Sequence, residues 1–413
     1  MLRRVLLIAP HGSYRTVPFL NAAKRQNLDV LIASEGQYSL VSEYAQGLHI
    51  NLDDIPTALA RIALVAQQQP FCGVVGTDDA SVELTDQVAA HLALPHNSPG
   101  AARIARRKDL ARACLQAAGV HVPWFHIVDL TQSLGAQLEA VTFPCVAKPV
   151  ALSASRGVIR ANNHKELIEA CIRIQRILSR IKNVEEQERI LIEGFIPGVE
   201  IAIEGLLRQG ELEILAIFDK PDPLDGPYFE ETYYITPSRL SPSVQAQAKQ
   251  EVAAACRAYG LREGPIHAEC RVNAAGVWIL EVAARTIGGL CGQLLRFGTG
   301  YTLEELVLMH ATQQLTRPMV IEGAAGVLMI PIPQAGILKR VEGLGAAERV
   351  PGVQEINIQV REGYELIPLP EGASYLGFIF AQGESPQEVE AALRAAHAQL
   401  RIVVSPLWKT RLA

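Results

Sequence analysis

The sequence predicts an α/β protein that begins with an open parallel sheet and continues into two α+β parts. Short apolar runs alternate with helix-like segments over the first hundred residues, which is the pattern of βαβ units. Strand-like runs dominate from Arg189 to Val282, and the last ninety-five or so residues mix strands with a helix. The length of 413 residues also exceeds what one hydrophobic core usually organises, at roughly 150 residues per domain.

Composition and charge narrow the class of protein. With 49% hydrophobic and 20% charged residues, the chain can form a sizeable core. Its net charge of −5 offers no overall attraction for a polyanion, so we expect no nucleic-acid partner. No run approaches the roughly 18 apolar residues of a membrane span. The seven scattered cysteines contain no CxxC pair, which predicts neither a disulfide framework nor a zinc site and favours a reducing cytoplasm.

The first sheet is expected to place a ligand at the carboxyl ends of its strands. The loop from Pro10 to Tyr14 lacks GxGxxG, so a dinucleotide site is disfavoured. Asp78 and Asp79 leave the third strand and either meet a ligand or cap the next helix, and their roles stay open. The expected elements are strands Val5 to Ala9, Asp29 to Ala33 and Gly73 to Val75, with helices Val17 to Gln26, Thr57 to Gln67 and Ser81 to Leu92.

A basic amphipathic helix is expected from Ala101 to Ala118, because Gly119 and Pro123 end it. Its arginines and Lys108 form either a cationic anchor for an anion or a solvated charged face. Further expected elements are strands Phe143 to Pro149, Arg189 to Ile192, Val327 to Ile332, Glu355 to Val360 and Leu376 to Ala381, with helices His164 to Ile181, Thr302 to Thr312 and Pro386 to Gln399.

Two apolar-rich strands around the turn Asn273 to Gly276 predict a β-hairpin. If Asn273 pairs with Val277, Glu269 lies opposite Glu281, on the face that also carries His267. Opposed Cβ atoms are about 4.5–5.5 Å apart, where like charges are destabilising. A cation is therefore expected between the two carboxylates, because Mg²⁺ is usually held by one or two carboxylates together with phosphate oxygens. The alternative is that Arg271 and Arg285 neutralise the pair without a metal.

Two other segments suit a nucleotide. Lys148 ends an apolar strand close to the small-residue loop Ser153 to Val158, whose backbone N–H groups could approach phosphate oxygens. This loop is not a Walker A sequence, and a plain β-turn is the alternative. Around the turn between Glu193 and Glu200, the carboxylates could accept hydrogen bonds from a ribose or from adenine, or form an ordinary row of solvent-facing acids with Glu204.

The order of these elements resembles the ATP-grasp superfamily from the N-terminus to about residue 315. Within it, the stretches from Glu281 to Gly289 and from Phe218 to Pro221 are similar to the L-amino-acid ligase (dipeptide synthetase) branch. The tail, with Ala324 to Val327 and Leu376 to Ile379, is similar to the C-terminal domain of that branch. The resemblance implies an N-terminal pre-ATP-grasp domain at 1–98, an ATP-grasp domain at 99–315 with a mobile lid at about 120–195, and a C-terminal α+β domain at 316–413.

The resemblance also implies roles for single residues. Lys108 and Lys148 would contact ATP phosphates. Arg285 would brace the transferred phosphoryl group or the substrate carboxylate. Apart from the resemblance, His267 shares the face of Glu269 and could contact substrate or accept a proton from the amine, although a structural role is the alternative. The remaining assignments are the phosphate-covering loop with Ser153, Ser155, Arg156 and Gly157; adenine contacts from Glu193 and the backbone of Phe195 and Ile196; the ribose contact Glu200; and the Mg²⁺ (or Mn²⁺) ligands Glu269 and Glu281.

Two departures from the superfamily pattern concern this site. The loop Ser153 to Gly157 contains less glycine than is usual, and Ala283 stands where many members carry an asparagine metal ligand. The number of metal ions therefore stays open. So do the roles of Lys220 and Glu231, which either line the substrate pocket or form a surface ion pair.

The implied activity is an ATP-dependent ligation of a carboxylate to an amine, both expected to be amino acids, through an acyl phosphate with release of ADP and phosphate. One alternative is a carboxylase of the same superfamily that activates bicarbonate. Another is a nucleotide-binding regulator without turnover. The sequence leaves the identities of acid and amine open, and it leaves the oligomeric state open, with a homodimer among the alternatives.

Overall fold

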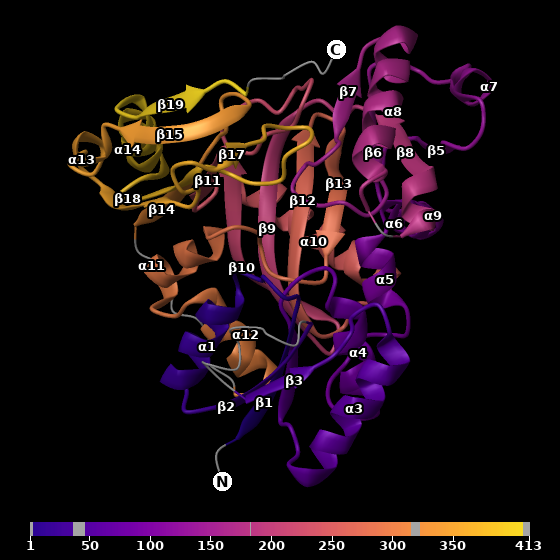
Figure 1. Ribbon diagram of the computed structural model, residues 1–413, viewed down its shortest axis with the longest axis vertical. Coiled ribbons are helices and arrows are strands. Elements are labelled where there is room, and N and C mark those ends of the chain that lie inside the picture. Colours follow the sequence, from indigo (N-terminus) through magenta and orange to yellow (C-terminus); the bar gives the residue numbers. More distant parts are fainter. Residues whose placement is uncertain (1–2, 36–45, 182, 315–322, 408–413) are drawn as a thin grey trace.

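The computed structural model describes residues 3–35, 46–181, 183–314 and 323–407 (Figure 1). The described residues form four sheets. Strands expected from the sequence are present in each of the three parts, so the predicted α/β class with an open parallel sheet and α+β regions is confirmed. No helix of the described chain is long and apolar enough to cross a membrane.

The N-terminal sheet has the order β3-β2-β1-β4, and all its neighbours are parallel. Each helix follows a strand, as the alternation predicts. The strand β3 was not expected, because its four residues carry no apolar alternation. The elements are β1 (Arg4–Ala9), α1 (Thr16–Arg25), β2 (Asp29–Ser34), β3 (Gln46–His49), α3 (Ile55–Gln68), β4 (Gly73–Gly76) and α4 (Val82–His91).

The prediction of a single basic helix over residues 101–118 is wrong. Two helices, α5 (Ala101–Arg106) and α6 (Lys108–Ala117), are separated by Arg107, whose backbone is extended at φ −99° and ψ 104°. The backbone N–H of Lys108 donates to the carbonyl of Val150 at 2.8 Å. The break thus brings Lys108 beside the strand that carries Lys148, and this tertiary hydrogen bond has no trace in the amphipathic pattern.

A separate four-stranded antiparallel sheet, β5-β8-β6-β7, covers one side of the molecule with α8 packed on it (Figure 1). It spans residues 125–194, inside the range predicted for the lid; the lid boundaries themselves stay a prediction. The elements are β5 (Phe125–Asp129), α7 (Leu134–Leu138), β6 (Cys145–Pro149), β7 (Ile159–Ala161), α8 (His164–Leu178), α9 (Val184–Glu188) and β8 (Arg189–Gly194).

The largest sheet has eight antiparallel strands in the order β13-β12-β9-β10-β11-β14-β18-β16. It runs through the domain boundary predicted near residue 316, because β11 pairs with β14. One face of this sheet therefore contains residues from both regions. Its strands are β9 (Val199–Arg208), β10 (Glu211–Lys220), β11 (Tyr233–Thr236), β12 (Gly264–Asn273), β13 (Gly276–Ala283), β14 (Ala324–Ile330), β16 (Val353–Ile358) and β18 (Gly377–Gly383).

The strand-like interpretation of residues 189–282 missed the longest helix described, α10 (Pro242–Tyr259). Ser241 caps it by accepting the backbone N–H of Val244, and it ends at Gly260 with φ of 79°. Its buried face consists largely of small residues, so the apolar period is weak. The Ser-Pro start and the glycine end were the available signals.

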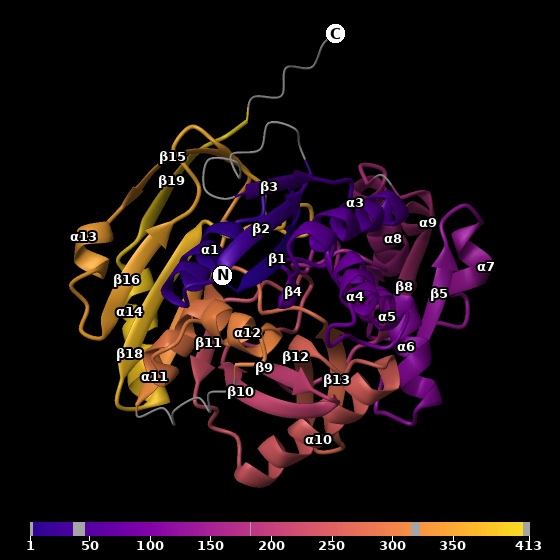
Figure 2. The ribbon, with the colours of Figure 1, turned by 90° about the horizontal axis from the view of Figure 1, so that it is seen from below.

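The remaining helices and strands pack against the sheets described above. Helix α12 packs on α1 and β4, and Figure 2 shows it between the N-terminal sheet and the large sheet. Helix α14 packs on β14 and β18 beside the three-stranded sheet β17-β15-β19, of which no strand was expected. These elements are η1 (Cys291–Leu295), α11 (Arg296–Thr299), α12 (Leu303–Ala311), β15 (Gly336–Glu342), α13 (Leu344–Ala347), β17 (Glu365–Leu366), α14 (Pro386–Ala398) and β19 (Arg401–Ser405).

Candidate active site

A cavity of about 540 Å³ lies where the sheet β5-β8-β6-β7, the large sheet and the carboxyl ends of the N-terminal strands meet. Most of the residues predicted for the site line this cavity. Lys108, Arg156 and Gly157 do not. The lining residues that the sequence predicted are Lys148, Ser153, Ser155, Glu193, Phe195, Ile196, Glu200, His267, Glu269, Glu281 and Arg285.

The hairpin β12–β13 places Glu269 opposite Glu281, but not through the predicted register. Asn273 pairs with Gly276, so the predicted pairing with Val277 is wrong. A β-bulge at Leu280 then shifts the register by one residue and restores the Glu269–Glu281 pair. The carbonyl of the bulged Leu280 accepts a hydrogen bond from Arg112 at 2.7 Å, which gives the extra residue a partner.

Two lysines neutralise this pair of carboxylates. The Nζ of Lys220 lies 3.1 Å from Glu269 Oε1, and the Nζ of Lys108 lies 2.9 Å from Glu281 Oε2. Lys108 therefore contacts a cavity-lining carboxylate although it does not itself line the cavity. The expected cation between the strands is thus partly supplied by the protein itself, from two residues far apart in the sequence.

Neither Arg271 nor Arg285 makes a direct salt bridge with this pair in the described residues, although Glu281 is close enough to Arg285 to help raise its pKa. Arg271 Nε donates to Glu200 at 3.0 Å, and Arg285 Nε donates to Asp79 at 2.9 Å. Because Glu200 already binds Arg271 and Lys220, its carboxylate is not free for a ribose in this conformation. Asp79 accepts the hydrogen bond of Arg285 and is not a helix cap, since the N-cap residue of α4 is Ser81.

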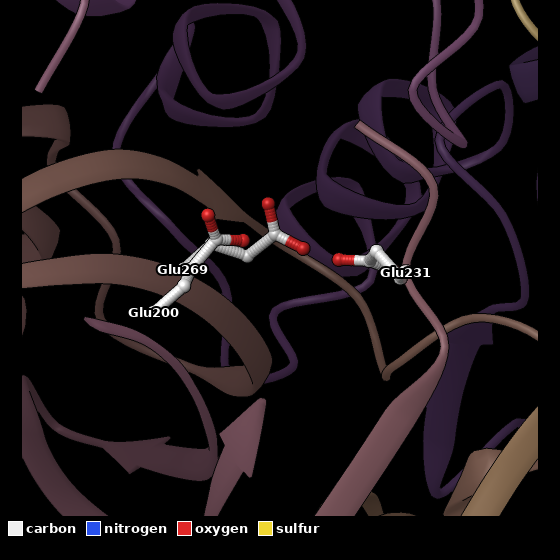
Figure 3. Close-up of side chains that lie close together, drawn as sticks. All are labelled: Glu200, Glu231 and Glu269. Atoms are coloured by element: carbon white, nitrogen blue, oxygen red, sulfur yellow. The ribbon is translucent and has the colours of Figure 1, made fainter. Parts of the chain in front are cut away.

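Three carboxylates gather around Lys220. Figure 3 shows Glu200 and Glu269 on neighbouring strands, with Glu231 facing them from the segment before β11. One oxygen from each lies within 4.8 Å of the others, and Lys220 Nζ donates to all three. Burial and the nearby Glu269 raise the pKa of Glu231 to about 7. Lys220 and Glu231 therefore form a buried network and not a surface ion pair.

The carboxylate oxygens of this site suit a divalent cation. Carboxylate oxygens are hard ligands of the kind that Mg²⁺ prefers, and a magnesium site needs only one or two of them beside phosphate oxygens. Both Glu269 and Glu281 line the cavity, so they can serve as the predicted ligands. A cation bound by Glu269 would compete with Lys220 for the same oxygens.

His267 is held between two acids. Its Nδ1 lies 3.1 Å from Glu204, and its Nε2 lies 3.7 Å from Glu269. Although burial favours the neutral ring, these two partners raise the pKa of His267 to about 9. The geometry thus favours a positioning role, since Glu204 also accepts the backbone N–H of Ile287 at 3.1 Å.

Lys148 and Glu193 form a buried triad with Arg112. Lys148 Nζ lies 2.5 Å from Glu193 Oε1, and Arg112 Nε lies 2.8 Å from Oε2. Although burial opposes the charge, the two cations lower the pKa of Glu193 to about 2. Both oxygens of Glu193 are thus occupied, and an adenine would meet the following residues, Gly194 to Ile196, at the cavity wall. Sequence reasoning missed Arg112, which appeared as one of several basic residues.

The small-residue loop contacts the C-terminal region. Gly157 N–H donates to the carbonyl of Pro370 at 2.9 Å, and Arg156 Nε donates to the carbonyl of Glu371 at 3.0 Å. Arg156 and Gly157 therefore contact the C-terminal region and do not line the cavity, whereas Ser153 and Ser155 do. On helix α8, Arg173 binds both oxygens of Glu371, at 2.6 and 2.9 Å.

We expect Mg·ATP to slow hydrogen exchange across residues 150–160, because the loop N–H groups gain phosphate acceptors. Without nucleotide, Glu371→Gln should speed exchange there by less than roughly fivefold, since a solvent-exposed ion pair is worth about 0–1 kcal/mol. Exchange followed by mass spectrometry measures both effects, with the exposed Glu362→Gln as the matched control. Unchanged exchange on saturation with Mg·ATP would contradict the loop's role as a phosphate cover.

Arg15, in the loop between β1 and α1, is a further basic residue of the cavity that the sequence did not predict. Its Nη1 donates to the carbonyl of Thr77 at 2.6 Å, and its Nη2 donates to the carbonyl of Ile287 at 2.9 Å. Arg15 thus connects the carboxyl end of β4 to the loop after Arg285. Asp78 accepts hydrogen bonds from Ser13 and Thr77 through one oxygen, at 2.6 and 2.5 Å.

Comparisons with known proteins agree with this geometry. Residues 141–293 match the family described as ATP-grasp domain, and residues 328–405 match the L-amino acid ligase C-terminal domain 2. The solved structure of L-amino acid ligase from Bacillus licheniformis is 27% identical, with a TM-score of 0.81 over 98% of this chain and 100% of that chain.

Two curated relatives extend the comparison. The uncharacterized protein y4rH of Sinorhizobium fredii (strain NBRC 101917 / NGR234) is 21% identical over 98% of this chain and 84% of its own length. Alanine–anticapsin ligase of Bacillus subtilis is 28% identical over 46% of this chain. That match spans 43% of the relative's length, less than half of it.

Proposed function

Since the chain is an ATP-grasp ligase, we propose that it joins the carboxylate of one amino acid to the amine of another. ATP would phosphorylate the acid, the amine would displace phosphate, and ADP would be released. The observation that carries this proposal is the convergence of Lys148, Glu269, Glu281 and Arg285 on one cavity. These residues come from three different strands and the loop after β13.

The residues of the chain contribute position and charge, and phosphoryl transfer requires little else from a protein. When bound, Mg²⁺ would neutralise charge on the phosphate oxygens, held by Glu269 and Glu281. Lys148 is a buried residue of β6 and lies at the cavity wall, where its ammonium group pairs with Glu193. A phosphate that approaches Lys148 would meet a cation already oriented by a salt bridge.

Arg285 is suited to brace the oxygens that gain charge as the acid attacks the γ-phosphate. Its Nε is bound to Asp79, and its Nη1 donates to the carbonyl of Thr286 at 2.9 Å. Two partners orient the guanidinium plane, so the donors without these partners can point toward a planar carboxylate or a phosphoryl group.

The two alternative activities are distinguished by their products. A carboxylase would release ADP with bicarbonate alone, and a regulator would bind ATP without releasing phosphate. The match of residues 328–405 to an L-amino acid ligase domain favours amino acids over bicarbonate. The charged residues of the cavity are present and paired, which disfavours an inactive site.

We expect hydroxylamine to replace the amine, because the acyl phosphate needs only the acid and ATP. A panel of amino acids incubated with Mg·ATP and hydroxylamine should yield a hydroxamate with stoichiometric ADP. Omission of the acid is the control and should abolish ADP release. Appearance of AMP and pyrophosphate in place of ADP would show activation by adenylation and would overturn the proposed mechanism.

A further inference from the structure

The face of the large sheet that borders the cavity is charged on one side and apolar on the other. On β13 to β10 it carries Glu281, Glu269, Glu200 and Lys220. On β11, β14 and β18 it carries aromatic and aliphatic side chains. These include the cross-strand pairs Tyr234–Val327, Val327–Phe380 and Met329–Phe378.

The apolar side reaches the cavity. Leu290, Met329, Tyr375 and Phe378 line it, and the rings of Tyr375 and Phe378 lie 6.2 Å apart in an edge-to-face arrangement. Within the described chain, every residue after Arg285 that lines the cavity is uncharged. Glu231 lies at the edge of this apolar side, where it accepts a hydrogen bond from the Tyr234 hydroxyl at 2.8 Å and already binds Lys220. Beyond Glu231, a charged group would lose its hydration without gaining an ionic partner, whereas an apolar group would be stabilised by burial.

The loop after Arg285 lies between this apolar wall and the N-terminal sheet. A Cβ at Gly289, where φ is +61°, would lie 2.9 Å from the Phe378 ring, so the loop backbone packs directly on that ring. The N–H of Gly289 donates to the Tyr14 hydroxyl at 2.8 Å. Beyond the loop, the N-terminal sheet contributes Asp78 and Asp79 to the cavity.

The two sides of the loop therefore differ in the groups that they favour. A free amine at neutral pH is an ammonium ion, and the carboxylate of Asp78 attracts it, whereas Asp79 is already paired with Arg285 at 2.9 Å. The apolar wall instead continues the sheet face that carries Lys220 and Glu269, where the γ-phosphate and the carboxylate that attacks it must meet.

We propose that the acid substrate is an amino acid with a bulky apolar side chain, bound against Leu290, Met329, Tyr375 and Phe378. This inference rests on the proposed ligase function and specifies its acid. The amine substrate approaches from the side of Asp78. Charged acids are disfavoured because these four residues offer no ionic partner, and small or polar acids are disfavoured because they bury less apolar surface against the wall.

The test measures hydroxamate formation from single amino acids with Mg·ATP and hydroxylamine. Leucine, methionine and phenylalanine should exceed alanine in kcat/KM by about 10-fold to 100-fold, at roughly fourfold per buried methylene. Glycine, serine and aspartate should be poor acids. A preference for polar acids, or an apolar preference that appears only in the amine when amino-acid pairs are used, would overturn the inference.

Variants of the wall locate the preference. Met329→Gln and Leu290→Gln should each lower the leucine-to-serine ratio of kcat/KM about 10-fold, with little change in the KM for ATP. Leu64→Gln, at a side chain 62% exposed on α3, is the matched control and should leave the ratio unchanged. An unchanged ratio in both wall variants would contradict the assignment.

Direct binding separates this inference from the ligase function. Calorimetry with a non-hydrolysable ATP analogue and Mg²⁺ should show leucine binding more tightly than serine, even where no product forms. Formation of hydroxamate only from polar acids would support the ligase and refute the apolar wall. Absence of both turnover and leucine binding would refute the ligase and the wall together.

Discussion

Glu269→Gln is expected to lower ligase turnover by about 10²–10³, by analogy with the loss of a single electrostatic group from other active sites. The substitution removes a charge that faces Lys220 at 3.1 Å and that can bind Mg²⁺. Steady-state ADP release at varied Mg²⁺ measures the loss. We expect Glu281→Gln to have an effect of the same order, because it lies opposite Glu269.

Both variants should remain folded. Each substitution keeps the shape of the side chain. Although burial opposes the charge, Lys220 and His267 hold the pKa of Glu269 well below its usual range, so this charge stabilises the fold at neutral pH. Thermal unfolding should therefore show a folded Glu269→Gln protein of somewhat lower stability. The exposed Glu362→Gln serves as the control with normal activity. Wild-type rates in both Glu269→Gln and Glu281→Gln would refute the metal assignment.

Arg285→Lys should lower hydroxamate formation by about 10²–10³, the size of effect that follows removal of one oriented donor. Arginine here binds Asp79 and the Thr286 carbonyl while it keeps further N–H groups available. An ammonium group is a point charge and cannot reproduce this planar arrangement. The loss should appear in kcat, and the KM for ATP should change little.

The position of Arg285 depends on Asp79, so a second variant tests the same arrangement. Asp79→Asn keeps a hydrogen-bond acceptor but removes the charge, and a smaller loss than in Arg285→Lys is expected. The exposed Arg296→Lys on α11 is the matched control. Wild-type hydroxamate formation by Arg285→Lys would show that Arg285 does not contact the reacting groups.

Local pattern was enough for much of the fold. The alternation of apolar runs and helices in the first hundred residues predicted the parallel sheet, because period-two and period-3.6 patterns reflect which face of each element is buried. The Asn-Gly turn region similarly predicted the hairpin of Glu269 and Glu281. A bulge at Leu280, which alternation alone does not reveal, was required to bring these residues opposite each other.

Other elements were not predicted because their buried residues do not form a clear periodic pattern in the sequence. Helix α10 packs through small side chains, and the interruption at Arg107 depends on a backbone hydrogen bond from Lys108 to Val150. The short strands β3 and β17 lack enough residues to show a pattern. Each of these was decided by a partner distant in the sequence.

The sequence by itself determined which residues could carry the chemistry: the strand lysine Lys148, the acids of the hairpin, and Arg285. Only the tertiary structure decided their partners. Lys220 stands among three carboxylates, and the apolar wall of β14 and β18 completes a cavity begun by the ATP-grasp strands. Pairings between side chains depend on how sheets pack in space, and electrostatic energies vary steeply with distances that no one-dimensional pattern contains.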